Sequence, residues 1–414
     1  MADYDVTVIG AGPAGLAAAL SAEQKGKKVL LIERSARMGG ILNQCIHDGF
    51  GLLRFGERLS GCEYANRYVH ALEASSVEVT LRTFVTRIVK KDGLFAVTLV
   101  TGQGIHTITS TALVLSTGCR ERTAKQVGIH GTRPAGIYTA GTAQYYINVL
   151  GEQPARRAVI LGSGDIGLIM ARRLTLEGAE VLGVYEAKPT PSGLTRNIVQ
   201  CLDDFSIPLH VSHTVTRVFG DSRLEAVEIS EVDERMRPIA GTEEVLACDT
   251  LILSVGLIPE NELAETLGVK LDPRTKGPLC DQCYETLVDG VFVCGNALHV
   301  NDLVDYVSES GAAAGAAAAD FCGKERELAE LSADRNFLYA VPQRLDTATD
   351  LRKTAVFFRS REVRGKSTVC VCVNGEPVFE KRYLHLRPPE MERIELDFSR
   401  VRPGDRVTLE LREV

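Results

Sequence analysis

The sequence predicts an α/β protein with two parallel-sheet domains and a smaller terminal domain made of β-strands. Two glycine-rich loops, at 10–15 and 162–167, each follow a run of apolar, β-forming residues and precede a stretch typical of a helix. After about residue 336 the helical patterns give way to short strands separated by turn residues such as Asn374-Gly375. These observations indicate two strand–helix–strand domains followed by a β-sandwich-like domain.

The first loop, Gly10-Ala11-Gly12-Pro13-Ala14-Gly15, lies inside a complete strand–helix–strand unit. Residues 4–9 are expected to form a buried parallel strand, and 16–25 are alanine-rich, as a helix should be. A second strand, 29–32, ends at Glu33, roughly 20 residues after the loop begins. Glycines let a pyrophosphate approach the free N–H groups of a helix N-terminus, and the carboxylate accepts hydrogen bonds from ribose hydroxyls. The unit is therefore typical of a Rossmann-like dinucleotide-binding domain.

The second loop, Gly162-Ser163-Gly164-Asp165-Ile166-Gly167, repeats this arrangement. A strand precedes it, a helical stretch follows it, and the next strand ends at Glu186. An acidic side chain at this position repels a 2′-phosphate, which favours NAD over NADP, while Lys188 argues in the other direction. Two such units in one chain predict two dinucleotides.

Composition excludes several classes of protein. The 414 residues carry a formal net charge of −7, so no basic excess is available to neutralise nucleic-acid phosphates. No run of 18 uncharged apolar residues is present, and the N-terminus enters a strand without a basic region or cleavage site. Eleven cysteines without a secretion signal suggest reduced thiols. We expect a cytoplasmic protein without a transmembrane segment and without nucleic acid as a partner.

Three further apolar strands, 112–118, 250–256 and 290–296, end in a glycine-containing turn. In open α/β sheets ligands bind at the carboxyl ends of the strands, so these turns are candidate binding segments. Taken together, the loops and the strand ends resemble the pyridine nucleotide-disulfide oxidoreductase superfamily of flavoproteins, over about residues 4–322. The resemblance implies FAD on the first loop and a pyridine nucleotide on the second.

The resemblance also implies a domain plan and a set of binding residues. It assigns 1–123 with 281–335 to an FAD-binding domain and 124–280 to an NAD(P)-binding domain, which leaves 336–414 for the β domain. A late Gly-Asp turn of the family corresponds to Gly295-Asn296, a departure that removes one negative charge beside the diphosphate. The residues assigned to FAD are Gly10, Gly12, Pro13, Ala14, Gly15, Glu33, Arg34, Gly40, Thr117, Gly118, Gly295 and Asn296, and those assigned to NAD are Gly162, Gly164, Asp165, Ile166, Gly167, Glu186 and Gly256.

The segment 301–322 contains the run 311–319, which is made only of glycine and alanine. Such a helix has almost no side-chain bulk, so another element is expected to approach its backbone closely. In the family this helix directs its N-terminus at the flavin, and residues 298–303 are therefore candidates for that contact.

The family's disulfide reductases carry two cysteines, about five apart, after the first domain's Gly-Gly turn. Here only Cys45 follows Gly39-Gly40, with His47 two residues later. Cys45 and His47 are our catalytic candidates. Three interpretations of Cys45 stay open: inert packing, a thiolate that tunes the flavin, or a sulfenic-acid peroxidase or oxidase cycle. His47 either lowers the thiol pKa, relays a proton or is a hydrogen-bonded structural histidine.

Two other cysteine pairs have spacings that could indicate redox chemistry or metal binding. Cys280 and Cys283 have redox spacing, but the family register places them away from the flavin's reactive edge. Cys370 and Cys372 alternate on one strand, which favours packing over metal binding. We therefore expect no metal site.

The sequence predicts an FAD-dependent oxidoreductase that transfers hydride between NAD(H) and FAD. The resemblance is closest to flavoprotein subunits that accompany amino-acid, amine or glycerol-3-phosphate dehydrogenases. It implies electron exchange with a partner flavoenzyme or electron-transfer subunit, in a hetero-oligomer or a homodimer. The alternatives are a stand-alone NADH oxidase or peroxidase that uses Cys45, and a non-catalytic FAD-binding scaffold subunit.

Overall fold

The computed structural model describes residues 2–413, which divide into two compact units. Among the described residues, unit 1 comprises 2–119 and 259–413, and unit 2 comprises 120–258. Residues 259–280, which the sequence resemblance assigned to the NAD(P)-binding domain, fall in unit 1. Their side chains explain this, since Ala264 and Val269 are buried in the same hydrophobic core as the sheet of unit 1. The ranges expected for the two cofactor domains stay a prediction.

Unit 1 contains a seven-stranded sheet in the order β5-β2-β1-β8-β7-β6, with β20 paired to β8. The strands β5, β2, β1, β8 and β20 are parallel, and β6 and β7 continue from β8 as an antiparallel extension. The bounds of these strands are β1 Tyr4–Ile9, β2 Val29–Ile32, β5 Glu78–Thr80, β6 Phe84–Lys91, β7 Leu94–Thr101, β8 Gly104–Leu115 and β20 Val291–Val293. The helices are α1 Pro13–Glu23, α2 Gly61–Glu73, α6 Glu262–Thr266 and α7 Val304–Asp320, with η1 Gly40–Gln44 and η5 Gly295–Ala297. Short strands β3 Asp48–Phe50 and β4 Leu59–Ser60 pair with each other.

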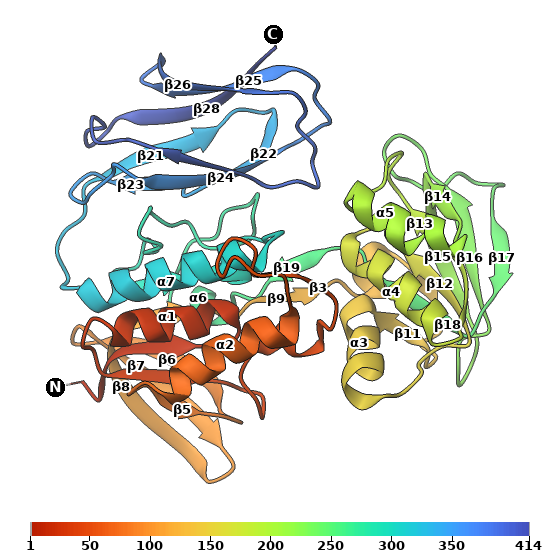
Figure 1. The fold of residues 1–414 in the computed structure, drawn as a ribbon, viewed down its shortest axis with the longest axis horizontal. Helices are drawn as coiled ribbons and strands as arrows, with labels where there is room; N and C mark the ends of the chain where they lie inside the picture. The colour runs from red at the N-terminus through yellow and green to blue at the C-terminus, as the bar shows by residue number, and fades with distance from the viewer. Residues whose placement is uncertain (1, 414) are drawn as a thin grey trace. The chain divides into compact units, whose positions relative to one another are not determined.

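Helix α7 lies directly against α1, as Figure 1 shows. A Cβ added at Gly311 would stand 2.1 Å from the Ala14 carbonyl oxygen, and one at Gly315 would stand 2.1 Å from the Ala18 carbonyl oxygen. Only glycine permits this approach of the two backbones. The expectation that another element lies close to the alanine-rich helix is confirmed, and that element is the helix that follows the first glycine loop.

The terminal β domain belongs to unit 1 and consists of two sheets, visible in Figure 1 as the layers above α7. One sheet has the order β23-β21-β28-β25-β26 and the other β22-β24-β27. Side chains of both sheets, including Leu331, Val356, Val371 and Leu409, share one hydrophobic core. The strands are β21 Leu328–Ala333, β22 Phe337–Val341, β23 Arg344–Asp346, β24 Thr354–Ser360, β25 Ser367–Val373, β26 Glu376–Tyr383, β27 Glu392–Leu396 and β28 Arg406–Glu413.

The sandwich expected at this end of the chain is therefore present, but its first strand comes earlier than the expected boundary at 336. Strand β21 pairs in parallel with β28, with Leu331 opposite Val407. Its alternating burial resembles that of the other sandwich strands. The sequence does not reveal this strand, because its partner β28 lies at the other end of the β domain.

Unit 2 is a second α/β domain with a five-stranded parallel sheet in the order β11-β18-β12-β13-β14. Its strands are β11 Ile137–Thr139, β12 Arg157–Leu161, β13 Glu180–Glu186, β14 Leu209–Val211 and β18 Thr250–Leu253. Its helices are α3 Ala140–Tyr145, α4 Asp165–Leu176 and α5 Thr195–Cys201, with a π-helical turn at Tyr146–Leu150. A second sheet contains β10 His130–Gly131, β15 His213–Phe219, β16 Ala226–Glu231 and β17 Glu244–Ala247. The predicted fold class, with two Rossmann-like domains and a β domain, is confirmed.

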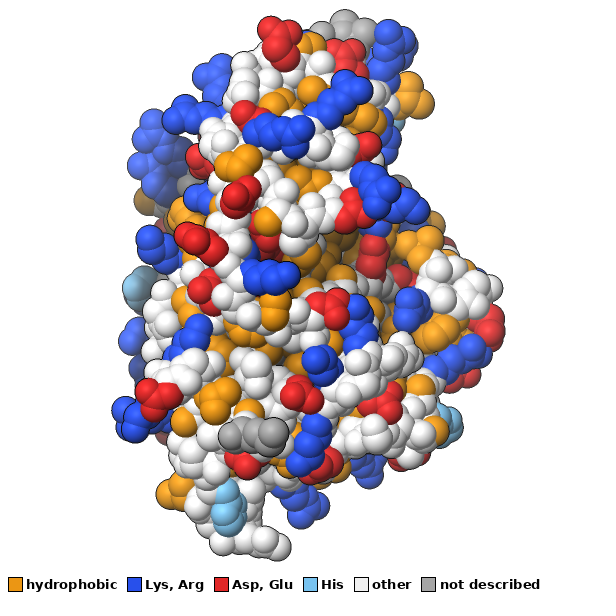
Figure 2. Space-filling view, turned by 90° about the vertical axis from the view of Figure 1, so that its left-hand side faces the viewer, with side chains coloured by type: hydrophobic (Ala, Val, Ile, Leu, Met, Phe, Trp, Pro, Cys, Tyr) orange, Lys and Arg blue, Asp and Glu red, His pale blue; other side chains and the backbone are white. Residues whose placement is uncertain are grey.

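The surface carries charges of both signs. On the face drawn in Figure 2, arginine and lysine side chains alternate with aspartate and glutamate, in keeping with the net charge of −7. Among residues 2–413, no helix is both long and apolar enough to cross a membrane.

Candidate functional site

The first glycine loop connects β1 to α1 in a turn that requires glycine at both ends. Gly10 has a φ of +104°, which side-chain-bearing residues rarely adopt. A Cβ at Gly15 would stand 1.8 Å from the Gly10 carbonyl oxygen and 2.6 Å from the Ser116 hydroxyl oxygen. Ser116 in turn donates its hydroxyl to the carbonyls of Ile9 and Gly10, at 2.9 and 2.8 Å. Ser116 therefore holds the base of the turn from the end of β8.

At the central position of the loop, Gly12, neither the backbone conformation nor a neighbouring protein atom requires glycine. Gly12 has a φ of −75°, and nothing in the described chain lies within 4 Å of a Cβ placed there. It is the N-cap of α1, and no side chain caps that helix end among the described residues. Pro13 and Ala14 form the first turn of the helix. The first N–H groups of α1 thus face a space that a side chain at position 12 would occupy.

Glu33 stands at the end of β2 with 7% of its surface exposed. Its carboxylate accepts the N–H of Ala11 and the N–H of Ser35, both at 2.7 Å. The first of these bonds ties the strand-end carboxylate to the glycine loop. A carboxylate has more lone pairs than these two bonds use, so ribose hydroxyls can still donate to it.

The remaining residues assigned to FAD fall into two groups around this loop. Arg34 forms an ion pair with Glu260 at 3.1 Å, while the Thr117 hydroxyl and the Gly118 carbonyl both bond to the backbone of Glu260. Gly40 and Gly295 lie against the loop itself, because a Cβ at Gly40 would stand 2.9 Å from Gly12 Cα and one at Gly295 2.9 Å from Ala14 Cβ.

Asn296 stands where the family has an aspartate. Both the oxygen and the nitrogen of its side-chain amide form hydrogen bonds. Its oxygen accepts the N–H of Asn301 at 3.0 Å, and its NH₂ donates to the Cys119 sulfur at 3.6 Å. The uncharged side chain therefore fixes the turn through local hydrogen bonds.

The second loop repeats these contacts in unit 2. A Cβ at Gly167 would stand 2.8 Å from the Gly162 carbonyl oxygen and 2.7 Å from Ser254 Cβ. Ser254 is the counterpart of Ser116, and it accepts the Gly167 N–H at 3.1 Å. Gly164 is the uncapped N-cap of α4, with a φ of −65° and no protein atom closer than 3.4 Å to an added Cβ. This loop presents a helix N-terminus in the same way as the first.

Glu186 mirrors Glu33 at the end of β13, with 6% of its surface exposed. Its carboxylate accepts the N–H and hydroxyl of Ser163, at 3.0 and 2.6 Å, and the N–H of Lys188 at 3.0 Å. Asp165 and Ile166 begin α4, where the Asp165 carboxylate accepts the N–H of Leu194 at 2.9 Å. Gly256, with a φ of +103°, follows β18.

The catalytic candidates Cys45 and His47 are not brought into contact by any hydrogen bond that the structure shows among the described residues. His47 Nδ1 lies 3.2 Å from the Asp48 carbonyl oxygen, and its ring packs near Phe50. Burial raises the pKa of the Cys45 thiol to about 12, and a second thiol, Cys62 at the start of α2, adds to the rise. A thiol with a raised pKa carries little thiolate at neutral pH, so this environment favours the packing interpretation of Cys45.

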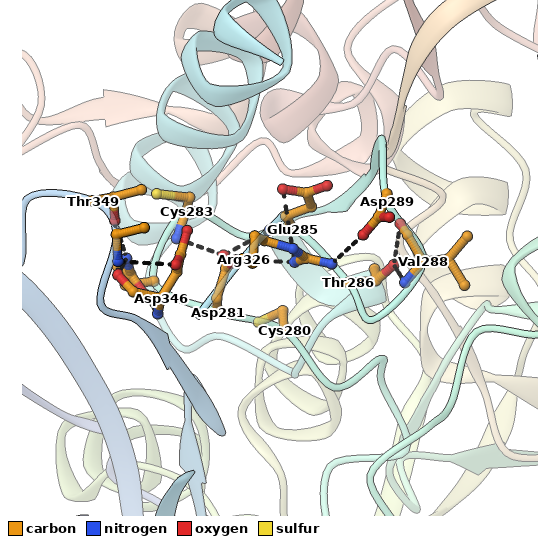
Figure 3. Close-up of polar contacts among 12 residues, drawn as sticks. Cys280, Asp281, Cys283, Glu285, Thr286, Val288, Asp289, Arg326, Asp346 and Thr349 are labelled. Carbon is orange, nitrogen blue, oxygen red and sulfur yellow. Dashed lines mark hydrogen bonds and ion pairs between the residues drawn. The ribbon is translucent and has the colours of Figure 1, made fainter. Parts of the chain in front are cut away.

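Cys280 is buried and Cys283 is half-buried, and both lie close to residues of the β domain in Figure 3. Burial raises the pKa of both thiols, to about 12 for Cys283. Within residues 2–413, no group of three or more histidine, cysteine, aspartate or glutamate side chains is arranged to hold a metal ion.

Close to these cysteines lies a cluster of charges around Arg326 (Figure 3). The guanidinium pairs with Asp281 at 3.1 Å, with Glu285 at 3.7 Å and with Asp289 at 2.9 Å. Burial raises the pKa of Asp281 to about 6 and that of Glu285 to about 7. One cation faces two buried carboxyls, so their protonation is linked.

The fold and the two loops define a class of protein: a flavoprotein architecture with two dinucleotide-binding domains, each with a glycine at the N-cap of the helix after its loop and a strand-end glutamate. The profile of the family described as "Pyridine nucleotide-disulphide oxidoreductase" matches residues 4–318. The chain belongs to this family, and it is an FAD-dependent oxidoreductase that binds a pyridine nucleotide.

The chain is similar to several curated relatives, and it shares its fold with a solved structure. The chain is 28% identical over 300 residues to hydrogen cyanide synthase subunit HcnB of Pseudomonas aeruginosa, covering 67% of this chain and 62% of the relative. It is 25% identical over 348 residues to an opine oxidase subunit of Agrobacterium tumefaciens, covering 80% and 65%. The chain thus spans a little under two thirds of the length of these two relatives. The crystal structure of T. acidophilum thioredoxin reductase has the same fold, with a TM-score of 0.64 at 23% identity, covering 77% of this chain and 99% of that one.

Several residues that build the site were not found by sequence reasoning. Ser116 and Ser254 both stand two residues before a strand-end glycine, and this shared spacing is a signal that was available. Glu260 and Cys62 gave no such signal, because the residues that they contact are far away in the sequence.

Proposed function

We propose that the protein transfers hydride between NAD(H) and FAD, with FAD on the first glycine loop and NAD(H) on the second. We further propose that its electrons pass to or from a partner dehydrogenase subunit. Bound flavin supplies the ability to accept a hydride and to release electrons one or two at a time. The chain's own residues bind and orient the two nucleotides.

The observation that carries the proposal is that space for a side chain is open at Gly12 and Gly164. At both positions the backbone conformation is open to any residue, and an added Cβ would meet no protein atom closer than 3.4 Å. Neither the backbone conformation nor crowding by protein atoms requires glycine there, although glycine is also an acceptable N-cap. A ligand that comes close to the backbone of each helix N-terminus does give a reason, since a pyrophosphate sits where a side chain would point.

Other residues orient the cofactors around these turns. The carboxylates of Glu33 and Glu186 are held by backbone N–H groups of their own loops, so they are fixed in place before a ribose arrives. Pre-fixed groups lose little freedom on binding, which strengthens the interaction. In the proposal, Arg34, which follows Glu33 and pairs with Glu260, supplies a cation for the anionic diphosphate.

The preference for NAD(H) rests on Glu186. Its buried carboxylate occupies the end of β13, where the family places the adenosine ribose, and a 2′-phosphate there would face a like charge. The Lys188 backbone N–H, rather than its ammonium group, contacts this carboxylate. We therefore propose NAD(H) over NADP(H).

The partner is proposed from the relatives. Both curated relatives are named as subunits, which indicates that related chains act within complexes. The raised pKa of Cys45 gives no support to a stand-alone peroxidase that uses this thiol. The proposal therefore favours electron exchange with another protein over turnover with peroxide.

Anaerobic titration with NADH tests the whole proposal. The FAD-loaded protein should lose the visible absorbance of its oxidised flavin on addition of NADH, more readily than with NADPH, and should turn over slowly with oxygen or peroxide. Rapid turnover with oxygen or peroxide that is lost in Cys45→Ser would establish the oxidase or peroxidase instead. Flavin that NADH does not bleach at any concentration would identify a scaffold subunit.

Two matched glycine variants separate the two sites. Gly12→Ala is expected to fold and to weaken FAD binding about tenfold or more, about 1.4 kcal/mol, because its methyl group fills the space that the diphosphate needs. Gly164→Ala should bind FAD normally and lose reduction by NADH. Normal FAD binding by Gly12→Ala would contradict the assignment of the first loop.

A further inference from the structure

The segment that joins η5 to α7 lies beside the first glycine loop. Gly295 packs against Ala14 in the first turn of α1, and its N–H donates to the Ser310 hydroxyl of α7 at 3.0 Å. Asn296 then accepts hydrogen bonds from both the N–H and the side-chain amide of Asn301, at 3.0 and 3.4 Å. Residues 295–303 thus form a short bridge from the phosphate end of α1 to the N-terminus of α7.

A single arginine of the terminal β domain contacts residues 300 and 302 of this bridge. Arg359, on β24, donates to the Val300 carbonyl at 3.3 Å and forms an ion pair with Asp302. The same guanidinium donates to the Tyr339 hydroxyl at 2.9 Å and to the carbonyls of Pro388 and Pro389. With 12% of its side chain exposed, Arg359 connects two parts of the β domain to the bridge.

Neighbouring contacts fasten the same segment. The Asp302 carboxylate also accepts the N–H of Met391 at 2.6 Å. The buried ring of His299 packs near Tyr339 and Phe357, with ring centres 5.7 and 5.4 Å away. Burial and the adjacent Arg359 cation lower the pKa of His299 to about 3, so this ring is neutral. Groups on the β domain therefore contact the bridge along residues 299–302.

We propose that Arg359 is a positioning residue for the flavin, acting from the β domain through Asp302 and Asn301 on the Gly295-Asn296 turn. This inference rests on the proposed placement of FAD on the first loop. In the proposal the terminal β domain is a structural part of the cofactor site, which differs from a separate module that serves only to dock a partner. Lysine cannot replace arginine here, because a point charge cannot reach the hydroxyl, the carbonyls and the carboxylate together.

The chain offers a matched control for this arginine. Arg393, on β27, also pairs with an acidic residue of unit 1, Glu309 in the second turn of α7. Its side chain is 24% exposed, and it makes no contact with residues 295–303 that the structure shows among the described residues. Removing either arginine breaks one ion pair that the β domain makes with the rest of unit 1, but only Arg359 holds the bridge.

The experiment measures FAD affinity and flavin midpoint potential in Arg359→Met, Arg359→Lys and Arg393→Met. FAD is added to the apoprotein and binding is followed by flavin fluorescence. Arg359→Met should weaken FAD binding about tenfold or more and shift the midpoint potential, Arg359→Lys should weaken it to a smaller extent, and Arg393→Met should stay within about twofold of the unchanged protein. FAD affinity and potential that Arg359→Met leaves unchanged would overturn the inference.

Two further variants complete the test. One replaces Arg359→Met if that variant does not fold, and the other tests whether Arg359 acts through Asn301. If Arg359→Met is insoluble, Asp302→Asn, which keeps the shape of the side chain, decides in its place and is expected to weaken FAD several-fold. In addition, the losses in Arg359→Met and Asn301→Ala should not add in the double variant, because both break one chain of contacts. Additive losses would show that Arg359 does not act through Asn301. An unchanged protein that binds no FAD at all would refute the proposed function, which is a different result.

Discussion

Replacing Glu285 with glutamine should flatten the pH dependence of stability. Glu285 lies with 11% of its side chain exposed, 3.7 Å from Arg326, and its carboxylate accepts the Gly290 N–H at 2.8 Å. Glutamine keeps the oxygen that accepts this bond and removes the negative charge. The variant thus changes the electrostatics of the cluster in Figure 3 with little change in shape.

The direction and size of the effect follow from the pKa. Burial raises the pKa of Glu285 from 4.5 to about 7, so the folded protein holds this proton over a pH range in which the unfolded chain has lost it. Stability that depends on this group is therefore complete below about pH 4.5 and falls as pH rises through about 7. At about 1.36 kcal/mol for each pH unit between the two pKa values, the loss is about 3 kcal/mol. Asp281 adds a loss of the same sign, offset by the single cation Arg326.

Urea unfolding of the FAD-saturated protein between about pH 5 and pH 8 measures this loss. The chain has no tryptophan, so circular dichroism is the suitable signal. Glu285→Gln should lose markedly less stability over this range than the unchanged protein. Asp289→Asn is the matched control, because Asp289 pairs with the same arginine but is 63% exposed and contributes less than Asp281 to the raised pKa of Glu285. Its profile should therefore stay much closer to that of the unchanged protein. Equal slopes for Glu285→Gln and the unchanged protein would refute the reasoning.

Three further predictions follow from contacts described above. Gly15→Ala places a methyl group 1.8 Å from the Gly10 carbonyl oxygen, so it should destabilise the fold by several kcal/mol, seen as a lower melting temperature that added FAD does not restore. Cys45 should react with iodoacetamide much more slowly at mildly alkaline pH than the exposed Cys322, as measured by peptide mass spectrometry, and equal rates would contradict the raised pKa of its thiol. Glu186→Gln should raise kcat/KM for NADPH relative to NADH about tenfold, and an unchanged ratio would show that Glu186 does not select the nucleotide.

The parts of the fold that local sequence patterns determine were predicted well. Apolar strands, the glycine loops and the strand-end acids are encoded within about 30 residues of each other, so periodicity and turn chemistry reveal them. The alanine run at 311–319 also predicted a close neighbour, and α1 is that neighbour. The assignment of individual residues to FAD and NAD stays a prediction.

Contacts between distant segments could not be predicted. Arg359 reaches a residue 57 positions earlier in the chain, and Thr117 bonds to a residue 143 positions later. No periodicity links such partners, because their proximity depends on how the β domain and the sheet of unit 1 fold together. The early start of the β domain at β21 was missed for the same reason, since its partner β28 lies near the other end of that domain.

The pairing of β28 has a consequence for how the protein is made. This strand lies between β21 and β25 in the middle of its sheet, although it is the last strand described along the sequence. During synthesis, β21 and β25 have no strand between them until residues 406–413 have left the ribosome. The sandwich is therefore completed only after that strand emerges. The contacts of Arg359 with residues 300–302 come from this sandwich, so they are completed at the same stage. A chain terminated before residue 406 would hold both glycine loops but would lack the strand that joins β21 to β25. If Arg359 positions the flavin as proposed, such a chain should bind FAD less tightly than the unchanged protein.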